Sequence, residues 1–424
     1  MPQADSAYEQ LKRKLKLQLS DSFGNGSRGR EDAPDREAVR SHVQQLVSAA
    51  QRERALAIDE PAQQRLVDEI ANEIAGIGPL EPLLADPEIT EIMVNGPREV
   101  YVEKRGRLER SPVQFEDANH LMLVIERMLD RVGLSVTKSE PCLDASLPDG
   151  TRLNIIIPPL VLNGPTLTLR KRSREWNLDA LVAQASLTPQ AAEFLKACIK
   201  AKINMVVSGG TSTGKTTIVS VLSSFIPQEE RIITIENVAE LELPKREHWI
   251  RLVGRSANME GRGEISLRTL VRNALRMRPD RIILGESRGG EALDVVQAMH
   301  TGHEGVITVL HGNSPQAAME RLQTLMLMSG LELPPQACQM QIASAVDVII
   351  HMARYADGSR RVAAIAHIES SHSGGFQLQE LFTFDVKGYR ADGTLDGALR
   401  YTGAHPKFSH KFQLHNVPMP GGIA

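Results

Sequence analysis

The sequence is poor in cysteine, in aromatic residues and in net charge. Its three cysteines, Cys142, Cys198 and Cys338, are too scattered for a disulfide framework or a paired zinc motif, so we expect single buried thiols. Aromatic residues make up 4% of the chain, and the formal net charge is −3. These values argue against a chain that binds nucleic acid or an anionic membrane through its overall charge.

Long apolar stretches are also missing. No segment approaches the roughly 18 uninterrupted apolar residues of a membrane span, and no apolar stretch of the secretory type follows the N-terminal charges. We therefore expect a cytoplasmic chain. Its 24% charged and 42% hydrophobic residues are typical of a soluble globular protein. Since 424 residues exceed one ordinary core, we expect two domains and an extension.

The pattern along the chain predicts three parts: a helical, partly flexible extension over residues 1–60, an α+β domain over 61–175, and a doubly wound α/β domain over 176–424. In the extension we expect helices over 8–19 and 37–56, around a flexible stretch at 24–36. The first helix is basic, which indicates either a solvated face or a docking arm for a partner or a membrane surface. We expect no regular structure in about the last 35 residues, which are rich in Gly, Pro and His.

Residues 209–216 read Gly-Gly-Thr-Ser-Thr-Gly-Lys-Thr and fit the phosphate-loop pattern G-x-x-x-x-G-K-[ST]. A predicted strand at 203–207 precedes them and a predicted helix at 217–225 follows, which favours a phosphate site over a Gly/Thr-rich surface turn. Backbone N–H groups and the helix N-terminus would face the phosphates. Lys215 is expected to reach the β- and γ-phosphates, and the Thr216 hydroxyl to hold Mg²⁺. The predicted nucleotide-binding residues here are Gly209, Gly210, Thr211, Ser212, Thr213, Gly214, Lys215, Thr216 and Thr217.

Carboxylates end two further predicted strands. The strand at 231–236 ends in Glu236, with Glu240 four residues later, and the strand at 281–286 ends in Glu286. Ligands of doubly wound sheets bind at the carboxyl ends of the strands. We therefore expect Glu236 to order Mg²⁺ or a water, and Glu286 to orient the attacking water. Each glutamate taken alone is equally compatible with capping a helix.

Two histidines and two arginines complete the candidate site. His311 follows a predicted strand at 306–310 and is either a sensor of the γ-phosphate or a structural residue, and His303 lies shortly before that strand. Arg152 and Arg170 lie in the α+β domain. They are either solvated, or they meet the nucleotide phosphates from across a domain or subunit border, a task that suits a planar and permanently charged guanidinium.

Several longer motifs carry a family resemblance. They are Gly-Pro-Leu-Glu-Pro-Leu-Leu at 78–84 with Glu-Ile-Met-Val-Asn-Gly at 91–96, Leu-Pro-Asp-Gly-Thr-Arg at 147–152, Val-Arg-Asn-Ala-Leu-Arg-Met-Arg-Pro-Asp at 271–280, and Thr-Gly-His at 301–303 with Leu-His-Gly-Asn-Ser at 310–314. With these motifs the chain resembles the ATPases of type II and type IV secretion systems and of type IV pili. Within that group it looks most like the tight-adherence (Tad/Flp) pilus ATPases of the CpaF type.

The resemblance implies a RecA-like ATPase domain, a PAS-like N-terminal domain, and ATP and Mg²⁺ as cofactors. It implies a homo-hexamer, peripheral at the inner membrane, that acts on membrane platform proteins to assemble or retract pili or to secrete protein. It also assigns Glu236 and Glu240 to the acidic box, Glu286 to catalysis, His303 and His311 to a histidine box, and Arg152 and Arg170 to phosphate sensing. Two positions depart from the family pattern: Asn237 replaces an aspartate, and Ser146 replaces an arginine.

Two other functions stay open at this point. A conjugation-type ATPase associated with nucleic acid would need a basic groove with stacking aromatics, which the composition disfavours. A nucleotide-binding regulatory module without hydrolysis would follow if Asn237 prevented magnesium binding.

Overall fold

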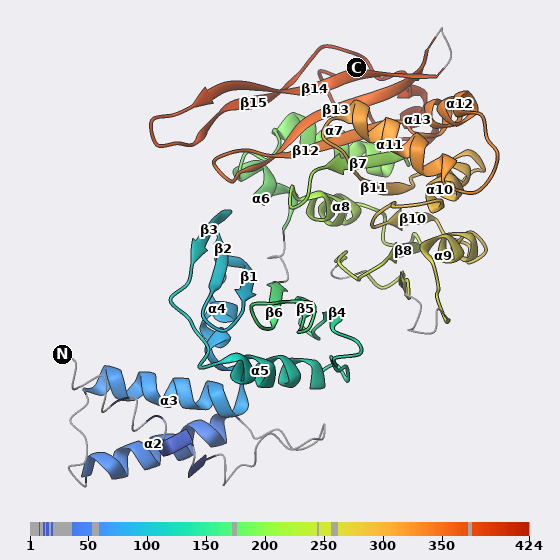
Figure 1. The fold of residues 1–424 in the computed structure, drawn as a ribbon. Helices are drawn as coiled ribbons and strands as arrows, with labels where there is room; N and C mark the ends of the chain where they lie inside the picture. Colours follow the sequence, from blue (N-terminus) through green and yellow to red (C-terminus); the bar gives the residue numbers. More distant parts are fainter. Residues whose placement is uncertain are drawn as a thin grey trace. The chain divides into compact units, whose positions relative to one another are not determined.

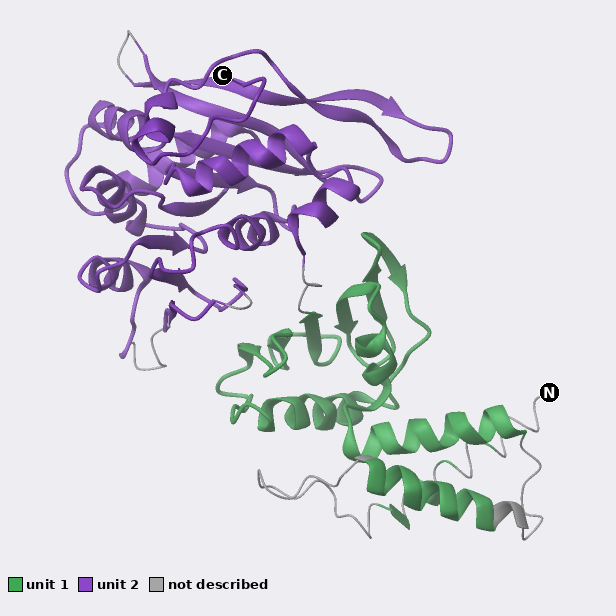
Figure 2. Ribbon diagram, turned by 180° about the vertical axis from the view of Figure 1, so that it is seen from behind, with its two compact units in different colours: residues 1–174 green, residues 175–424 purple. Residues whose placement is uncertain are grey.

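The computed structural model describes residues 36–52, 59–171, 176–243, 246–255, 262–371 and 375–423, together with residues 8, 12, 14–16, 18 and 19. The chain divides into two compact units (Figures 1 and 2), Met1–Arg174 and Glu175–Ala424, which are called unit 1 and unit 2. Among the described residues, no helix is both long enough and apolar enough to cross a membrane.

Unit 1 begins with packed helices. Helix α2 (Arg36–Arg52) lies along α3 (Glu60–Ala75), as Figure 1 shows, and Leu15 and Leu19 are buried with apolar side chains of both helices. Lys12 pairs with Glu69 at 2.6 Å. Leu15 and Leu19, in the first helix predicted over 8–19, are therefore buried within unit 1. The predicted flexible stretch lies outside the described residues, except Arg36, which begins α2.

The remainder of unit 1 is an antiparallel sheet with the strand order β3-β2-β1-β6-β5-β4. Helix α5 (Ala118–Asp130) buries its apolar face in the core of this sheet, and the short helices η1 (Gly78–Leu80) and α4 (Glu81–Ala85) precede β1. Strands β3 and β4 were not predicted, because their residues are polar or partly exposed and show no alternation. The strands are β1 (Ile89–Asn95), β2 (Val100–Lys104), β3 (Arg107–Arg110), β4 (Cys142–Ser146), β5 (Arg152–Ile156) and β6 (Thr166–Arg170).

Unit 2 is built on a nine-stranded sheet with the order β15-β14-β13-β12-β7-β11-β10-β8-β9. The six strands from β12 to β9 pair in parallel, and β13 to β15 add an antiparallel edge. This arrangement is the mostly parallel α/β fold that the sequence predicts. The strands are β7 (Met205–Gly209), β8 (Ile232–Glu236), β9 (Trp249–Val253), β10 (Arg281–Leu284), β11 (Ile307–His311), β12 (Val348–Arg354), β13 (Arg360–Ser370), β14 (Phe376–Tyr389) and β15 (Leu395–Tyr401).

Helices cover both faces of the sheet. In β7, Met205 and Val207 pack into one apolar cluster, and Val206 packs into the other. Burial on both faces explains why the parallel strands are continuous apolar runs in the sequence. Helices α6 (Leu178–Ala183), α7 (Pro189–Lys200), α8 (Lys215–Ser223) and α13 (Ser409–Leu414) contribute to the first cluster, and α9 (Leu267–Ala274), α10 (Glu291–His300), α11 (Pro315–Leu327) and α12 (Pro335–Ala345) to the second.

The prediction that the last 35 or so residues lack regular structure is wrong. This stretch forms β15 and α13, and it buries Leu395, Leu399, Phe408 and Phe412 in the core of unit 2. The stretch is rich in glycine, proline and histidine, and the apolar residues that dock it were overlooked.

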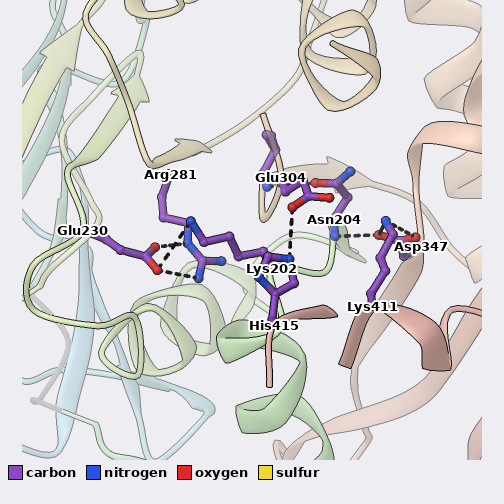
Figure 3. Close-up of polar contacts among 9 residues, drawn as sticks. Lys202, Asn204, Glu230, Arg281, Glu304, Asp347, Lys411 and His415 are labelled. Atoms are coloured by element: carbon purple, nitrogen blue, oxygen red, sulfur yellow. Dashed lines mark hydrogen bonds and ion pairs between the residues drawn. The ribbon is translucent and has the colours of Figure 1, made fainter. Parts of the chain in front are cut away.

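The amino ends of the parallel strands hold a set of buried ion pairs (Figure 3). Asp347 accepts hydrogen bonds from Lys411 Nζ on α13, at 2.7 and 2.8 Å, and from the backbone N–H of Asn204 at 2.9 Å. Glu304 lies 3.0 Å from His415, and the buried Arg281 pairs with Glu230. The contacts of Lys411 and His415 fasten the C-terminal segment to the edge of the sheet opposite its carboxyl ends.

Candidate active site

The phosphate loop, residues 209–216, connects β7 to α8 and has positive φ at three residues, Gly209, Ser212 and Gly214. Gly214 caps α8 with φ +94°, a conformation that favours glycine, and Ser212 has φ +57°. Thr213 Oγ1 donates to the carbonyl of Gly210 at 3.0 Å. The loop therefore curls around its own backbone and directs the first N–H groups of α8 toward one point.

Lys215 lies over this loop. Its side chain is buried, and Nζ donates to the carbonyl oxygen of Gly210 at 2.6 Å. A buried ammonium near a helix N-terminus places positive charge where backbone donors converge. The loop and Lys215 together fit the phosphates of a nucleoside triphosphate. Thr211 and Thr217 lie beside them, at the exposed tip of the loop and in the first turn of α8.

The carboxylate nearest to Thr216 belongs to Glu240. Thr216 Oγ1 donates to Glu240 Oε2 at 3.0 Å, whereas Glu236 Oε1 accepts the backbone N–H groups of Glu240 and Leu241, both at 2.9 Å. Burial raises the pKa of the Glu236 carboxyl, and the two backbone donors oppose that rise. Glu236 thus holds the segment that carries Glu240. A Cβ at Gly285, just after β10, would lie 2.7 Å from Glu236 Cγ, so a larger residue there would displace the Glu236 side chain.

Asn237 is exposed and does not interrupt this chain of contacts. Its side-chain oxygen faces Gly254, just beyond the end of β9. The departure from the family's usual aspartate therefore leaves the bond from Thr216 to Glu240 in place.

Glu286 lies just beyond β10 and contacts two cationic or potentially cationic groups. Its Oε1 is 3.0 Å from His311 Nε2, and its Oε2 is 2.7 Å from Arg288 Nη2. Burial lowers the pKa of the His311 imidazole, and the charge of Lys215 lowers it further, while Glu286 acts in the opposite direction. A neutral His311 that donates Nε2–H to Glu286 orients the carboxylate without neutralising it.

Two further residues contact the phosphate loop or its strand and were missed in the sequence. His351 Nδ1 on β12 lies 2.9 Å from Ser208 Oγ on β7, and burial followed by the charge of Lys215 lowers its pKa. Arg360 Nε on β13 donates to the carbonyl of Ser212 at 2.9 Å. Neither residue belongs to a local motif. The sequence does not show which strands neighbour theirs in the sheet.

The other predicted site residues lie elsewhere. Arg152 and Arg170 belong to unit 1, where they face each other directly across β5 and β6, and Ser146 is the partner of Arg152 on β4. His303 lies before β11 at the amino edge of the sheet, while the phosphate loop follows β7 at the carboxyl edge. His303, assigned by resemblance to the histidine box, therefore lies at the edge of the sheet opposite the phosphate loop of its own chain.

A phosphate loop on a parallel sheet, with carboxylates beyond two neighbouring strands, defines a P-loop NTPase. Among the described residues no group of three or more His, Cys, Asp or Glu side chains is placed to hold a metal.

Comparison with known proteins identifies the family. The chain matches the type II/IV secretion system protein family over residues 73–391 and belongs to it. It is 37% identical over 304 residues to a putative conjugal transfer protein of Mycobacterium tuberculosis, covering 70% of this chain and 86% of that one. It is 35% identical over 301 residues to the type IV secretion system protein VirB11 of Brucella suis, covering 65% and 83%. The chain is therefore an ATPase of this family.

Solved structures agree on the fold. The ATPase DotB of Legionella pneumophila superimposes with a TM-score of 0.50 at 18% identity, over 68% of this chain and 79% of that one. DotB of Yersinia pseudotuberculosis gives a TM-score of 0.51 at 18% identity, over 69% and 78%. Unit 2 is thus a RecA-like P-loop domain.

Proposed function

We propose that this ATPase is the motor of a Tad-like pilus or of a related secretion machine. In this proposal it works as a homo-hexamer, peripheral at the inner membrane, and moves a membrane platform protein. The observation that carries the proposal is the placement of Glu286 beside His311 at the carboxyl edge of the sheet, next to the strand that carries the phosphate loop. That is where the γ-phosphate of a nucleotide held by Lys215 would lie.

The residues of unit 2 divide the work. Lys215 and the N-terminus of α8 bind the phosphates, and Glu286 orients and polarises the attacking water, with His311 fixing its carboxylate. Mg²⁺, when bound, neutralises charge on the phosphate oxygens. We assign its protein ligand to Thr216. Glu240 accepts the hydrogen bond of Thr216 and would hold that hydroxyl in place, and Glu236 positions Glu240.

The arginine pair of unit 1 supports a grip on the nucleotide from a second side. Like charges directly opposite each other in a sheet repel, and Arg152 and Arg170 are direct partners across β5 and β6. An anion between the two guanidinium groups would remove that repulsion. We propose that Arg152 and Arg170 contact nucleotide phosphate, so that hydrolysis releases unit 1 and converts cleavage into movement.

Replacing Glu286 by Gln tests this assignment. The amide keeps the shape of the side chain but cannot accept a proton, so we expect ATP hydrolysis to fall by about 100-fold or more. Binding of a fluorescent ATP analogue should stay within about threefold of wild type. Glu332→Gln, an exposed carboxylate of the same unit, is the control and should change neither quantity. Retention of normal turnover in Glu286→Gln would falsify the role of this residue.

The name of the Mycobacterium relative keeps a second function in view, a motor for conjugal DNA transfer. The low aromatic content and the negative net charge disfavour a stacking groove for single-stranded DNA. Hydrolysis measured with and without single-stranded DNA separates the two functions. We expect no stimulation, and a stimulation that disappears at high salt would favour the DNA motor.

A further inference from the structure

The start of β13 contacts both the phosphate loop and the turn that follows α6. Arg360 Nε donates to the carbonyl of Ser212 in the loop at 2.9 Å. The backbone carbonyl of the same arginine accepts a hydrogen bond from Ser186 Oγ at 2.8 Å. One residue on β13 therefore joins two segments that are far apart in the sequence.

The contact with Ser212 falls where the loop needs support. Ser212 has φ +57°, a left-handed conformation that costs a non-glycine residue about 1–2 kcal/mol. The Arg360 side chain also passes close to Gly214, because a Cβ added there would lie 3.7 Å from Arg360 Cδ. A charged donor on the Ser212 carbonyl fixes the loop in the shape that turns its N–H groups toward the phosphates.

On the other side, Ser186 ties β13 to α6. Ser186 is buried, and its backbone carbonyl also accepts the N–H of Val362 at 2.8 Å. The N–H of Ser186 donates to the carbonyl of Leu181 in α6 at 2.8 Å, and Arg361 Nη1 donates to the carbonyl of Gln184 at 2.6 Å. Helix α6 begins at Leu178, four residues after the boundary at Arg174 between the two units.

We propose that Arg360 is a positioning residue that shapes the phosphate loop and couples it, through Ser186, to α6. A nucleotide that orders the loop would then also order the segment that receives the chain from unit 1. The inference deepens the proposed function, because it names the route by which the nucleotide state reaches the border of the units. The coupling requires that the phosphate loop binds nucleotide, but it does not depend on which pilus or secretion machine the ATPase drives.

Two measurements on the full-length protein test the coupling. Binding of a fluorescent ADP analogue reports on the loop, and hydrogen–deuterium exchange of residues 178–187, at saturating ADP and without it, reports on α6 and the turn after it. In wild type we expect ADP to slow exchange in this segment. Arg360→Ala should weaken ADP binding by about tenfold, as for the loss of one hydrogen bond from a charged donor. At saturating ADP it should also lose the protection of 178–187.

Three more variants sharpen the result. Ser186→Ala removes only the hydroxyl donor and should lose much of the protection while it binds ADP within about twofold of wild type. Arg360→Lys keeps the charge but has no donor at the Nε position, so it should behave like Arg360→Ala. Arg400→Ala, an exposed arginine on β15, is the matched control and should behave like wild type.

Equal protection of 178–187 in wild type and Arg360→Ala at saturating ADP would overturn the coupling. Full recovery by Arg360→Lys would also overturn it, because charge alone would then be sufficient. If wild type itself does not bind ADP, the proposed nucleotide site fails instead, and the two failures are thus distinguishable.

Discussion

Single residues at the carboxyl edge of the sheet act through their surroundings. Glu286 lies between His311 and Arg288, and Glu240 is held against Thr216 by a buried Glu236. In both cases a neighbouring group fixes where the carboxylate points. The chemistry of each glutamate therefore depends on the protonation or burial of a second side chain.

The pH dependence of hydrolysis follows from His311. Its pKa lies below the ordinary value of about 6.5, because burial and Lys215 disfavour the imidazolium, and Arg288 and Arg321 act in the same direction against Glu286. As the pH falls through this lowered pKa, the imidazole gains a proton and holds the Glu286 carboxylate as an ion pair. We expect kcat to be flat near neutrality and to fall with a midpoint below about pH 6.5.

A pH–rate profile of His311→Gln checks this prediction. Glutamine keeps a donor but does not titrate, so the acid limb should flatten or move while some activity remains. An acid limb identical to that of wild type would assign the titration to a different group.

At the scale of elements, the C-terminal helix is held by charge as well as by apolar packing. Lys411 on α13 makes two hydrogen bonds to Asp347, whose side chain is only 11% exposed. Burial raises the pKa of the Asp347 carboxyl, and Lys411 opposes that rise. Docking of α13 thus brings the positive charge of Lys411 to the buried carboxylate of Asp347, which lies between α12 and β12.

Replacing Lys411 by Met should lower the free energy of unfolding of unit 2 by about 3 kcal/mol, because one partner of a buried pair is removed. The pKa of the Asp347 carboxyl is raised in the folded state. The stability that this group contributes is therefore fully present below its unfolded-state pKa and is lost as the pH rises through its folded-state pKa. The effect should therefore be larger at pH 8 than at pH 5.

Urea unfolding followed by tryptophan fluorescence measures this change, because both tryptophans, Trp176 and Trp249, belong to unit 2. Arg390→Met, which breaks an exposed pair with Asp396, is the control and should cost about 0–1 kcal/mol. Equal effects of the two substitutions would contradict the structural role of α13.

At the scale of the whole molecule, mixed subunits test our proposal that Arg152 and Arg170 contact nucleotide phosphate. Arg152→Ala keeps the phosphate loop intact, and Lys215→Ala keeps the arginine pair intact. If the arginines act across subunits of a homo-hexamer, mixed oligomers contain some complete sites. We expect each variant alone to be nearly inactive and the mixture to recover a measurable part of the hydrolysis.

The measurement is phosphate release from the two variants, alone and after co-assembly, with the double variant Arg152→Ala/Lys215→Ala as a control. When the double variant is mixed with Arg152→Ala, neither partner supplies an intact Arg152, so hydrolysis should not recover. An inactive mixture in which the subunits have demonstrably co-assembled would place the arginines within their own chain's site or outside catalysis.

The sequence by itself identified the phosphate loop, the parallel strands around it and the acids beyond β8 and β10. Each of these signals lies within about ten consecutive residues, where loop chemistry and continuous apolar runs are visible without any knowledge of the fold. The resemblance to the secretion ATPases also rested on such local motifs.

Only the tertiary structure decided which of these residues meet. Glu240 rather than Glu236 reaches Thr216, and His351 and Arg360 reach Ser208 and Ser212 from 143 and 148 residues away. It also placed Arg152 opposite Arg170 and buried the C-terminal segment that composition alone left unstructured. The physical reason is that strand order and register, which sum many weak contacts over the whole sheet, determine these neighbours, and no short stretch of sequence encodes them.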